Sequence, residues 1–165
     1  MAIAIAWCTC KKCGEKFQKT AQKSMSSRQA ASWVRWALEY YDICPDCEFE
    51  ARAEKAAELG QKAVAAGLPK LQGSQKQIVW AEQIRAELLE ESRDFISNER
   101  EYIEKHETDE TKRKEKMRIL DICEEMLGQM QREAHASWWI DHRHFSGPCQ
   151  MKQMYIAQRV NKLES

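Results

Sequence analysis

The chain has 165 residues, and its 26 Lys and Arg balance 26 Asp and Glu, so the formal net charge is zero at pH 7. This balance excludes a uniformly basic nucleic-acid binder and an acidic DNA mimic. Six Gly and three Pro in the whole chain favour helices over a loop-rich β-sandwich or barrel. The longest apolar run, residues 2–7, is too short for a membrane span or a secretory signal, so no membrane partner is expected and the expected location is the cytoplasm.

A β-hairpin and a helix are expected first in the chain. Alternating Ile and Ala residues lead into a Cys-Lys-Lys-Cys-Gly turn, and this pattern predicts a hairpin over 2–17. A capping box formed by Ser26 and Gln29 then begins a helix that ends near Tyr40. Apolar residues recur along this segment at helical spacing, which gives the helix one apolar face.

A second helix is expected from Cys44 to Leu59. Pro45 suits the first helical position, and the Ala- and Glu-rich run that follows it propagates a helix. Gly60 is expected to end the helix, because glycine commonly follows a helix C-terminus. Together with the hairpin, these helices are expected to form a module over residues 1–66.

Residues 67–73 are expected to be a linker, because they place a proline between two leucines and end on glycine. The remaining residues, 74–165, are expected to form a helical domain that closes with an amphipathic helix around 151–160. The expected fold class is therefore mainly α with a small β-hairpin.

The helical domain is expected to begin with two long antiparallel helices. A second capping box, Ser74 with Gln77, starts a helix that continues to about Lys105. A partner helix follows over about 109–134. The turn between the two helices is short, which is typical of an antiparallel helical hairpin.

The strongest chemical signal is a pair of Cys-x-x-Cys motifs, Cys10 with Cys13 and Cys44 with Cys47. Each motif aims two thiolates at one point, and zinc binds four such ligands in a tetrahedron. Gly14 follows the first pair and the second pair begins a helix, so the pattern predicts a treble-clef-like or zinc-ribbon-like module with one structural Zn²⁺. Four cysteines leave no coordination position for a water molecule, so the metal is not expected to take part in catalysis.

Cys8 offers a third thiol close to the first motif, and the sequence leaves open whether it replaces Cys10 as a ligand. The Cys-x-x-Cys-Gly spacing favours Cys10. Cys8 is then either a buried strand residue or a spare thiol.

No catalytic motif is recognisable, and we expect that the chain is not an enzyme. It has no phosphate-binding glycine loop, nucleophile elbow or dinucleotide motif. His142, His144 and Cys149 gather after a tryptophan pair, but their spacing matches no metal-binding or catalytic pattern, and their role stays open.

Basic and aromatic residues interleave in residues 1–38, where seven Lys and Arg are accompanied by one acidic residue. Lysines would neutralise phosphates and exposed aromatic rings would stack on bases, so nucleic acid is an expected partner. The expected contacts are Lys11, Lys12, Lys16, Lys19, Lys23, Arg28 and Arg35. The alternative left open is that the tryptophans belong to the core and the lysines form a solvated face.

A second hypothesis assigns the function to the helical domain. An uncovered apolar stripe on the long helices would form a homodimer or bind a partner protein, for example one in a nucleic-acid-processing complex. Trp138, Trp139 and Arg143 are the expected contacts for such a partner.

The two Cys-x-x-Cys pairs occur together with two longer motifs: Leu-Pro-x-Leu-x-Gly-Ser-x-Lys-Gln-Ile-x-Trp-Ala-Glu-x-Ile-Arg over 68–85, and Trp-Trp-Ile-Asp-x-Arg over 138–143. In this combination the chain resembles a family of small uncharacterised proteins found in bacterial genomes and on phages and mobile elements. The resemblance implies no catalytic activity, and a mobile-element origin implies an accessory role such as an anti-CRISPR-like inhibitor of a host defence system. We expect the two longer motifs to pack together as one joint.

Overall fold

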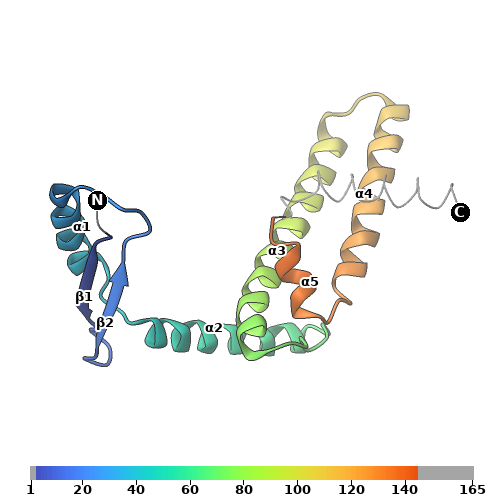
Figure 1. Cartoon of the computed structure of the whole chain (residues 1–165). Coiled ribbons are helices and arrows are strands. Elements are labelled where there is room, and N and C mark those ends of the chain that lie inside the picture. Colours follow the sequence, from blue (N-terminus) through green and yellow to red (C-terminus); the bar gives the residue numbers. More distant parts are fainter. Residues whose placement is uncertain (1–2, 145–165) are drawn as a thin grey trace, which may run out of the picture. The chain divides into compact units, whose positions relative to one another are not determined.

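The structure is a computed structural model that describes residues 3–144, and it is mainly helical with one small antiparallel sheet (Figure 1). Its elements are β1 (Ile5–Thr9), β2 (Lys16–Thr20), α1 (Ser27–Tyr40), α2 (Pro45–Ala65), α3 (Gln75–His106), α4 (Glu110–Met130) and α5 (Ala136–Asp141). Both capping boxes predicted from the sequence are present, at the starts of α1 and α3. None of the helices in residues 3–144 has the length and apolar character needed to cross a membrane. Cys149 and the helix expected around 151–160 lie outside the described residues.

Contacts divide the chain into two compact units, Met1–Glu54 and Lys55–Ser165, each with its own core. The division therefore falls inside α2 and not in the 67–73 segment that was expected to be a linker. That segment packs onto the second unit, where Leu71 is buried and Leu68 is half-buried against the core. Burial of one leucine contributes about 1.5–3 kcal/mol, which offsets part of the conformational entropy that is lost when the segment is ordered.

The first unit packs one face of its hairpin against α1. β1 pairs with β2 so that Trp7 lies opposite Gln18 and Cys8 lies opposite Phe17. Successive side chains of a strand point to opposite faces. Cys8 and Phe17 are buried with Ala37 of α1, whereas Trp7 and Gln18 lie exposed on the outer face.

α2 continues past Gly60, where the sequence predicted its end. A Cβ atom at Gly60 would lie 3.1 Å from a carboxylate oxygen of Glu82 in α3, so the glycine allows the two helices to pack closely. This packing outweighs the low helix propensity of glycine. α2 ends instead in a Schellman motif, in which Gly67 has a φ of +82° and the Leu68 N–H donates to the Ala63 carbonyl oxygen.

The second unit is built around α3 and α4, which lie side by side and are joined by a short turn (Figure 1). Arg100 of α3 pairs with Asp121 and Glu124 of α4 at 3.2 and 2.9 Å. The apolar side chains between the helices form the core of the unit and include Leu88, Leu89, Ile96, Cys123, Met126 and Leu127.

α5 packs against α3, as expected for the joint between the two longer motifs. Its Trp139 is fully buried in the core and donates its indole N–H to the Glu133 carbonyl oxygen at 3.2 Å. Backbone hydrogen bonds from Gln72 to Ala134 and from Ala136 to Gln72 fix the chain before α5. The sequence did not predict this helix, because six residues are too few to show a helical period.

Candidate metal centre

Four cysteine sulfurs converge in the first unit. The Sγ atoms of Cys10, Cys13, Cys44 and Cys47 all lie within 4.8 Å of one another, and none of these residues forms a disulfide. Cys13 Sγ and Cys44 Sγ are 3.7 Å apart. A tetrahedral zinc ion with Zn–S bonds of about 2.3 Å requires sulfur–sulfur separations of about 3.8 Å. The cluster that the sequence predicted can therefore hold a metal ion.

The turn between β1 and β2 positions the first pair. The Cys10 N–H donates to the Glu15 carbonyl oxygen at 2.8 Å, and the Gly14 N–H donates to the Cys10 carbonyl oxygen at 2.9 Å. Gly14 has a φ of +78°, a left-handed conformation that glycine adopts without strain. The chain reverses at this point and presents the sulfurs of Cys10 and Cys13 to the same centre.

The start of α2 positions the second pair. Cys44 precedes the helix and its Sγ accepts a hydrogen bond from the Cys47 N–H at 3.4 Å. The Lys11 N–H donates to the Asp42 carbonyl oxygen at 2.7 Å and ties the β1–β2 turn to this segment. Two motifs far apart in the sequence are thereby brought together.

The acidity of the thiols explains why a cation suits the site. The backbone N–H groups of Cys44 and Cys13 hydrogen-bond to the Cys10 sulfur and lower the pKa of that thiol to about 6. A hydrogen bond with Cys44, together with burial, raises the pKa of the Cys47 thiol well above its ordinary value. One thiolate is therefore favoured, but further thiolates repel it at these short distances. A divalent cation would stabilise all four thiolates together.

Cys8 lies outside the cluster, although it is close in the sequence. It is buried in the face that packs on α1, with its Sγ 3.5 Å from the Ala37 carbonyl oxygen. The structure therefore places Cys10, and not Cys8, at the centre.

Two of the basic residues expected to contact nucleic acid are paired with acidic side chains. Lys11 lies 3.2 Å from Asp42, and Lys12 lies 3.3 Å from Glu50. Asp42 and Glu50 therefore lie beside the β1–β2 turn of the first unit and offset its positive charge. Because these partners are more than thirty residues away along the chain, the local charge balance could not reveal them.

Of the other five expected contacts, Lys16 and Lys19 lie on opposite faces of the hairpin. Lys16 is exposed on the outer face of the hairpin, opposite Thr9. The Lys19 side chain lies over the Tyr41 ring, with its Nζ 4.7 Å from the ring centre. The remaining three are exposed in α1 or in the connection that precedes it: Lys23, Arg28 and Arg35.

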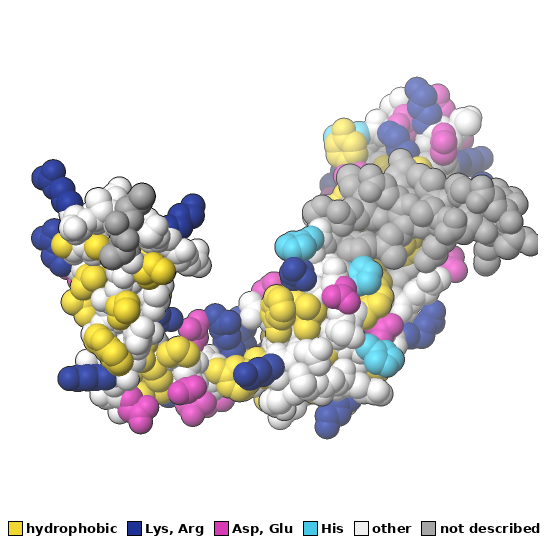
Figure 2. All heavy atoms as spheres, in the orientation of Figure 1, with side chains coloured by type: hydrophobic (Ala, Val, Ile, Leu, Met, Phe, Trp, Pro, Cys, Tyr) yellow, Lys and Arg dark blue, Asp and Glu magenta, His cyan; other side chains and the backbone are white. Residues whose placement is uncertain are grey.

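Large apolar residues lie on the outer face of the hairpin, and of these only Trp7 was among the aromatic residues singled out from the sequence. Ile3, Ile5 and Trp7 alternate with the buried side chains of β1 and have 56%, 49% and 62% of their surface exposed. We call these three residues, together with Lys16 and Gln18, the outer face. Period-two alternation predicts that the large apolar residues of a strand face the core, so no sequence signal indicated that these three residues are exposed. Figure 2 shows hydrophobic side chains gathered on the surface of this unit.

The residues expected to contact a partner protein have different environments. Trp139 is fully buried, so the expectation that it contacts a partner is wrong for this structure. Trp138 is half-buried and stacks on the His142 ring, with ring centres 4.0 Å apart. Arg143 is exposed, and its guanidinium lies 5.5 Å from the ring centre of Trp80.

Comparison of the chain with protein-family models, with curated proteins and with solved structures finds no match.

Proposed function

We propose that this chain is a non-catalytic binding protein whose N-terminal unit is stabilised by one Zn²⁺ ion in a treble-clef-like site. Cys10, Cys13, Cys44 and Cys47 would supply all four ligands. Tetrahedral sites of four sulfurs suit zinc or iron, and a closed zinc site of this kind is structural. Binding of a structural zinc ion contributes about 10 kcal/mol or more to folding. Zinc binding would therefore stabilise the N-terminal unit, whose own apolar core is small.

Native mass spectrometry of the purified protein, combined with elemental analysis, tests the metal. We expect one zinc per chain in the wild type and in Cys8→Ser, and loss of zinc in Cys44→Ser. Cys8→Ser is the matched control, because it removes a buried thiol outside the cluster. Iron at one per chain, or undiminished zinc in Cys44→Ser, would overturn the assignment.

We propose further that the N-terminal unit binds nucleic acid through the outer face. The observation that carries this proposal is the exposed Trp7 ring, which lies directly opposite Gln18 and beside Lys16. An aromatic ring on a sheet gives a base a surface for stacking, and stacking contributes about 1–3 kcal/mol per base. The ammonium group of Lys16 would bind a phosphate, and the Gln18 amide can both donate and accept a hydrogen bond.

Fluorescence anisotropy with short single- and double-stranded DNA and RNA, at two salt concentrations, tests this surface. We expect Trp7→Ala to weaken binding by about 5–150-fold, the equivalent of one lost stacking contact. Trp36→Ala is the matched control, because this exposed tryptophan lies on α1, on the other side of the sheet. Equal losses in the two variants, or no binding at low salt, would contradict the proposal.

A protein partner is the second candidate, favoured by the apolar character of Ile3 and Ile5 and by the exposed Trp80 beside Arg143. Such a partner would fit the accessory, defence-inhibiting role that the sequence resemblance implies. The two candidates differ in salt dependence, because phosphate contacts release counterions and apolar contacts do not.

A further inference from the structure

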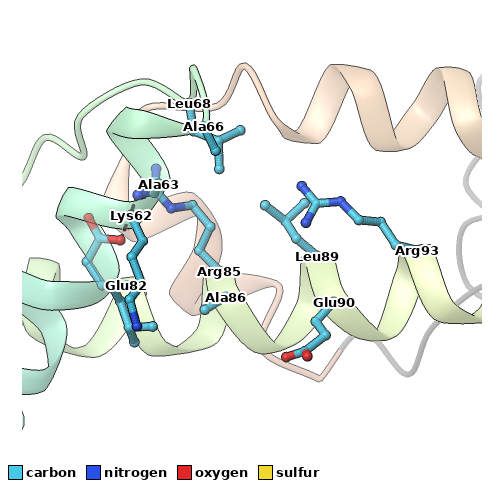
Figure 3. Close-up of a pocket in the computed structure, with 11 residues that line it drawn as sticks. Lys62, Ala63, Ala66, Leu68, Glu82, Arg85, Ala86, Leu89, Glu90 and Arg93 are labelled. Atoms are coloured by element: carbon cyan, nitrogen blue, oxygen red, sulfur yellow. Dashed lines mark hydrogen bonds and ion pairs between the residues drawn. The ribbon is translucent and has the colours of Figure 1, made fainter.

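A cavity of about 310 Å³ in the second unit is not used by either proposed function (Figure 3). It lies between the C-terminal half of α2, the chain that follows this helix, and α3. Most of its wall is apolar and is formed by Leu59, Ala63, Ala66, Leu68, Ala86 and Leu89. The volume is at the lower end of the range of about 300–1,000 Å³ for small-molecule sites.

A buried ion pair forms one side of the cavity. Arg85 donates to a carboxylate oxygen of Glu82 at 2.6 Å and to the Pro69 carbonyl oxygen at 2.7 Å. The side chains of Arg85 and Glu82 are only 1% and 5% exposed. Because Arg85 neutralises Glu82, the buried carboxylate does not repel an anion that enters the cavity.

A second guanidinium lies at the open side. Figure 3 shows the side chain of Arg93 directed along α3 toward the space between Leu89 and Leu68, whereas Glu90 points away from this space. Among the described residues, Arg93 forms no ion pair or side-chain hydrogen bond, so its charge is available to a ligand. The lining carries three cationic residues and two acidic ones, which leaves one positive charge.

We propose that this cavity binds a small apolar carboxylate, of the kind represented by a short- or medium-chain fatty acid. The alkyl chain would lie against the leucine and alanine side chains, where it leaves water. The carboxylate would form a charge-assisted, bidentate pair with the Arg93 guanidinium. A phosphate ion would lack the apolar contact, and a neutral alcohol would lack the ionic one.

Titration of the zinc-loaded full chain with octanoate, followed by ¹H–¹⁵N NMR, tests this proposal. For a ligand of ten non-hydrogen atoms we expect saturation at about 1–10 mM, with shifts confined to the C-terminal half of α2 and to residues 82–93 of α3. 1-Octanol tests the apolar contact without the charge, and inorganic phosphate tests the charge without the apolar contact. Both are expected to bind at least about tenfold more weakly.

Two exposed charges on α3 provide a matched pair of variants. Arg93→Glu is expected to weaken octanoate binding at least about tenfold, whereas Lys76→Glu carries the same change in charge outside the cavity and should bind normally. Ala86→Phe, which fills the cavity, should abolish the saturable shifts. Unchanged affinity in Arg93→Glu, or no saturable binding in the wild type, would overturn the proposal.

Discussion

Removing one partner of the buried pair between Glu82 and Arg85 should destabilise the second unit far more than removing both. Arg85→Met leaves the Glu82 carboxylate buried without a cation, and an uncompensated buried charge costs about 3–5 kcal/mol. The Pro69 carbonyl oxygen also loses its donor, which costs about 1–3 kcal/mol if no other donor replaces it. In Arg85→Met/Glu82→Leu only the second cost remains, so the double variant should be more stable than the single one.

Urea titration followed by the indole N–H resonance of Trp139 measures this difference, because that group donates a hydrogen bond inside the same unit. The exposed ion pair between Arg113 and Glu110 of α4, which lies in the same unit, provides the control. Arg113→Met should change the free energy of unfolding by no more than about 0.5 kcal/mol. If the double variant is as unstable as the sum of the two single variants, the reasoning about an isolated buried charge is refuted.

Three further predictions concern the metal, the core and the pH dependence. Removal of the proposed metal by a strong chelator should raise amide exchange in β1, α1 and the first turn of α2, while α3 and α4 stay protected. Hydrogen-exchange mass spectrometry measures this, and an equal loss of protection in both units would show that the units are not independent. Ser92→Ala should stabilise the protein by about 1 kcal/mol, because the Ser92 hydroxyl is fully buried with no hydrogen-bond partner in the described part of the chain; a lower urea midpoint would contradict this. The ion pair with Lys116 lowers the pKa of Glu107, so the stability this carboxylate contributes is present above its ordinary pKa and is lost as the pH falls through the lowered value. Glu107→Gln should remove that part of the acid dependence in thermal unfolding curves.

Features encoded by neighbouring residues could be predicted from the sequence. Both capping boxes need only residues three positions apart, and each Cys-x-x-Cys motif with its following turn or helix start is equally local. The convergence of the two cysteine pairs also followed from their chemistry, because two incomplete ligand sets require each other to complete a tetrahedron.

Features that depend on distant partners were missed. Gly60 continues α2 because Glu82 packs against it, and no window around Gly60 contains that information. The ion pairs of Lys11 and Lys12 were missed for the same reason, since their acidic partners lie beyond α1 in the sequence. Tertiary contacts decide these cases, and local propensity is too weak to oppose them.

The four sulfurs of the metal centre are not equally accessible, since Cys13 is exposed while Cys10, Cys44 and Cys47 are buried. A competing chelator or an oxidant therefore reaches the proposed zinc ion from the Cys13 side, and exchange of the metal would proceed by stepwise displacement of this ligand first. Equilibrium affinity would depend on all four thiolates, whereas the rate of metal exchange would depend mainly on the accessibility of the Cys13 sulfur.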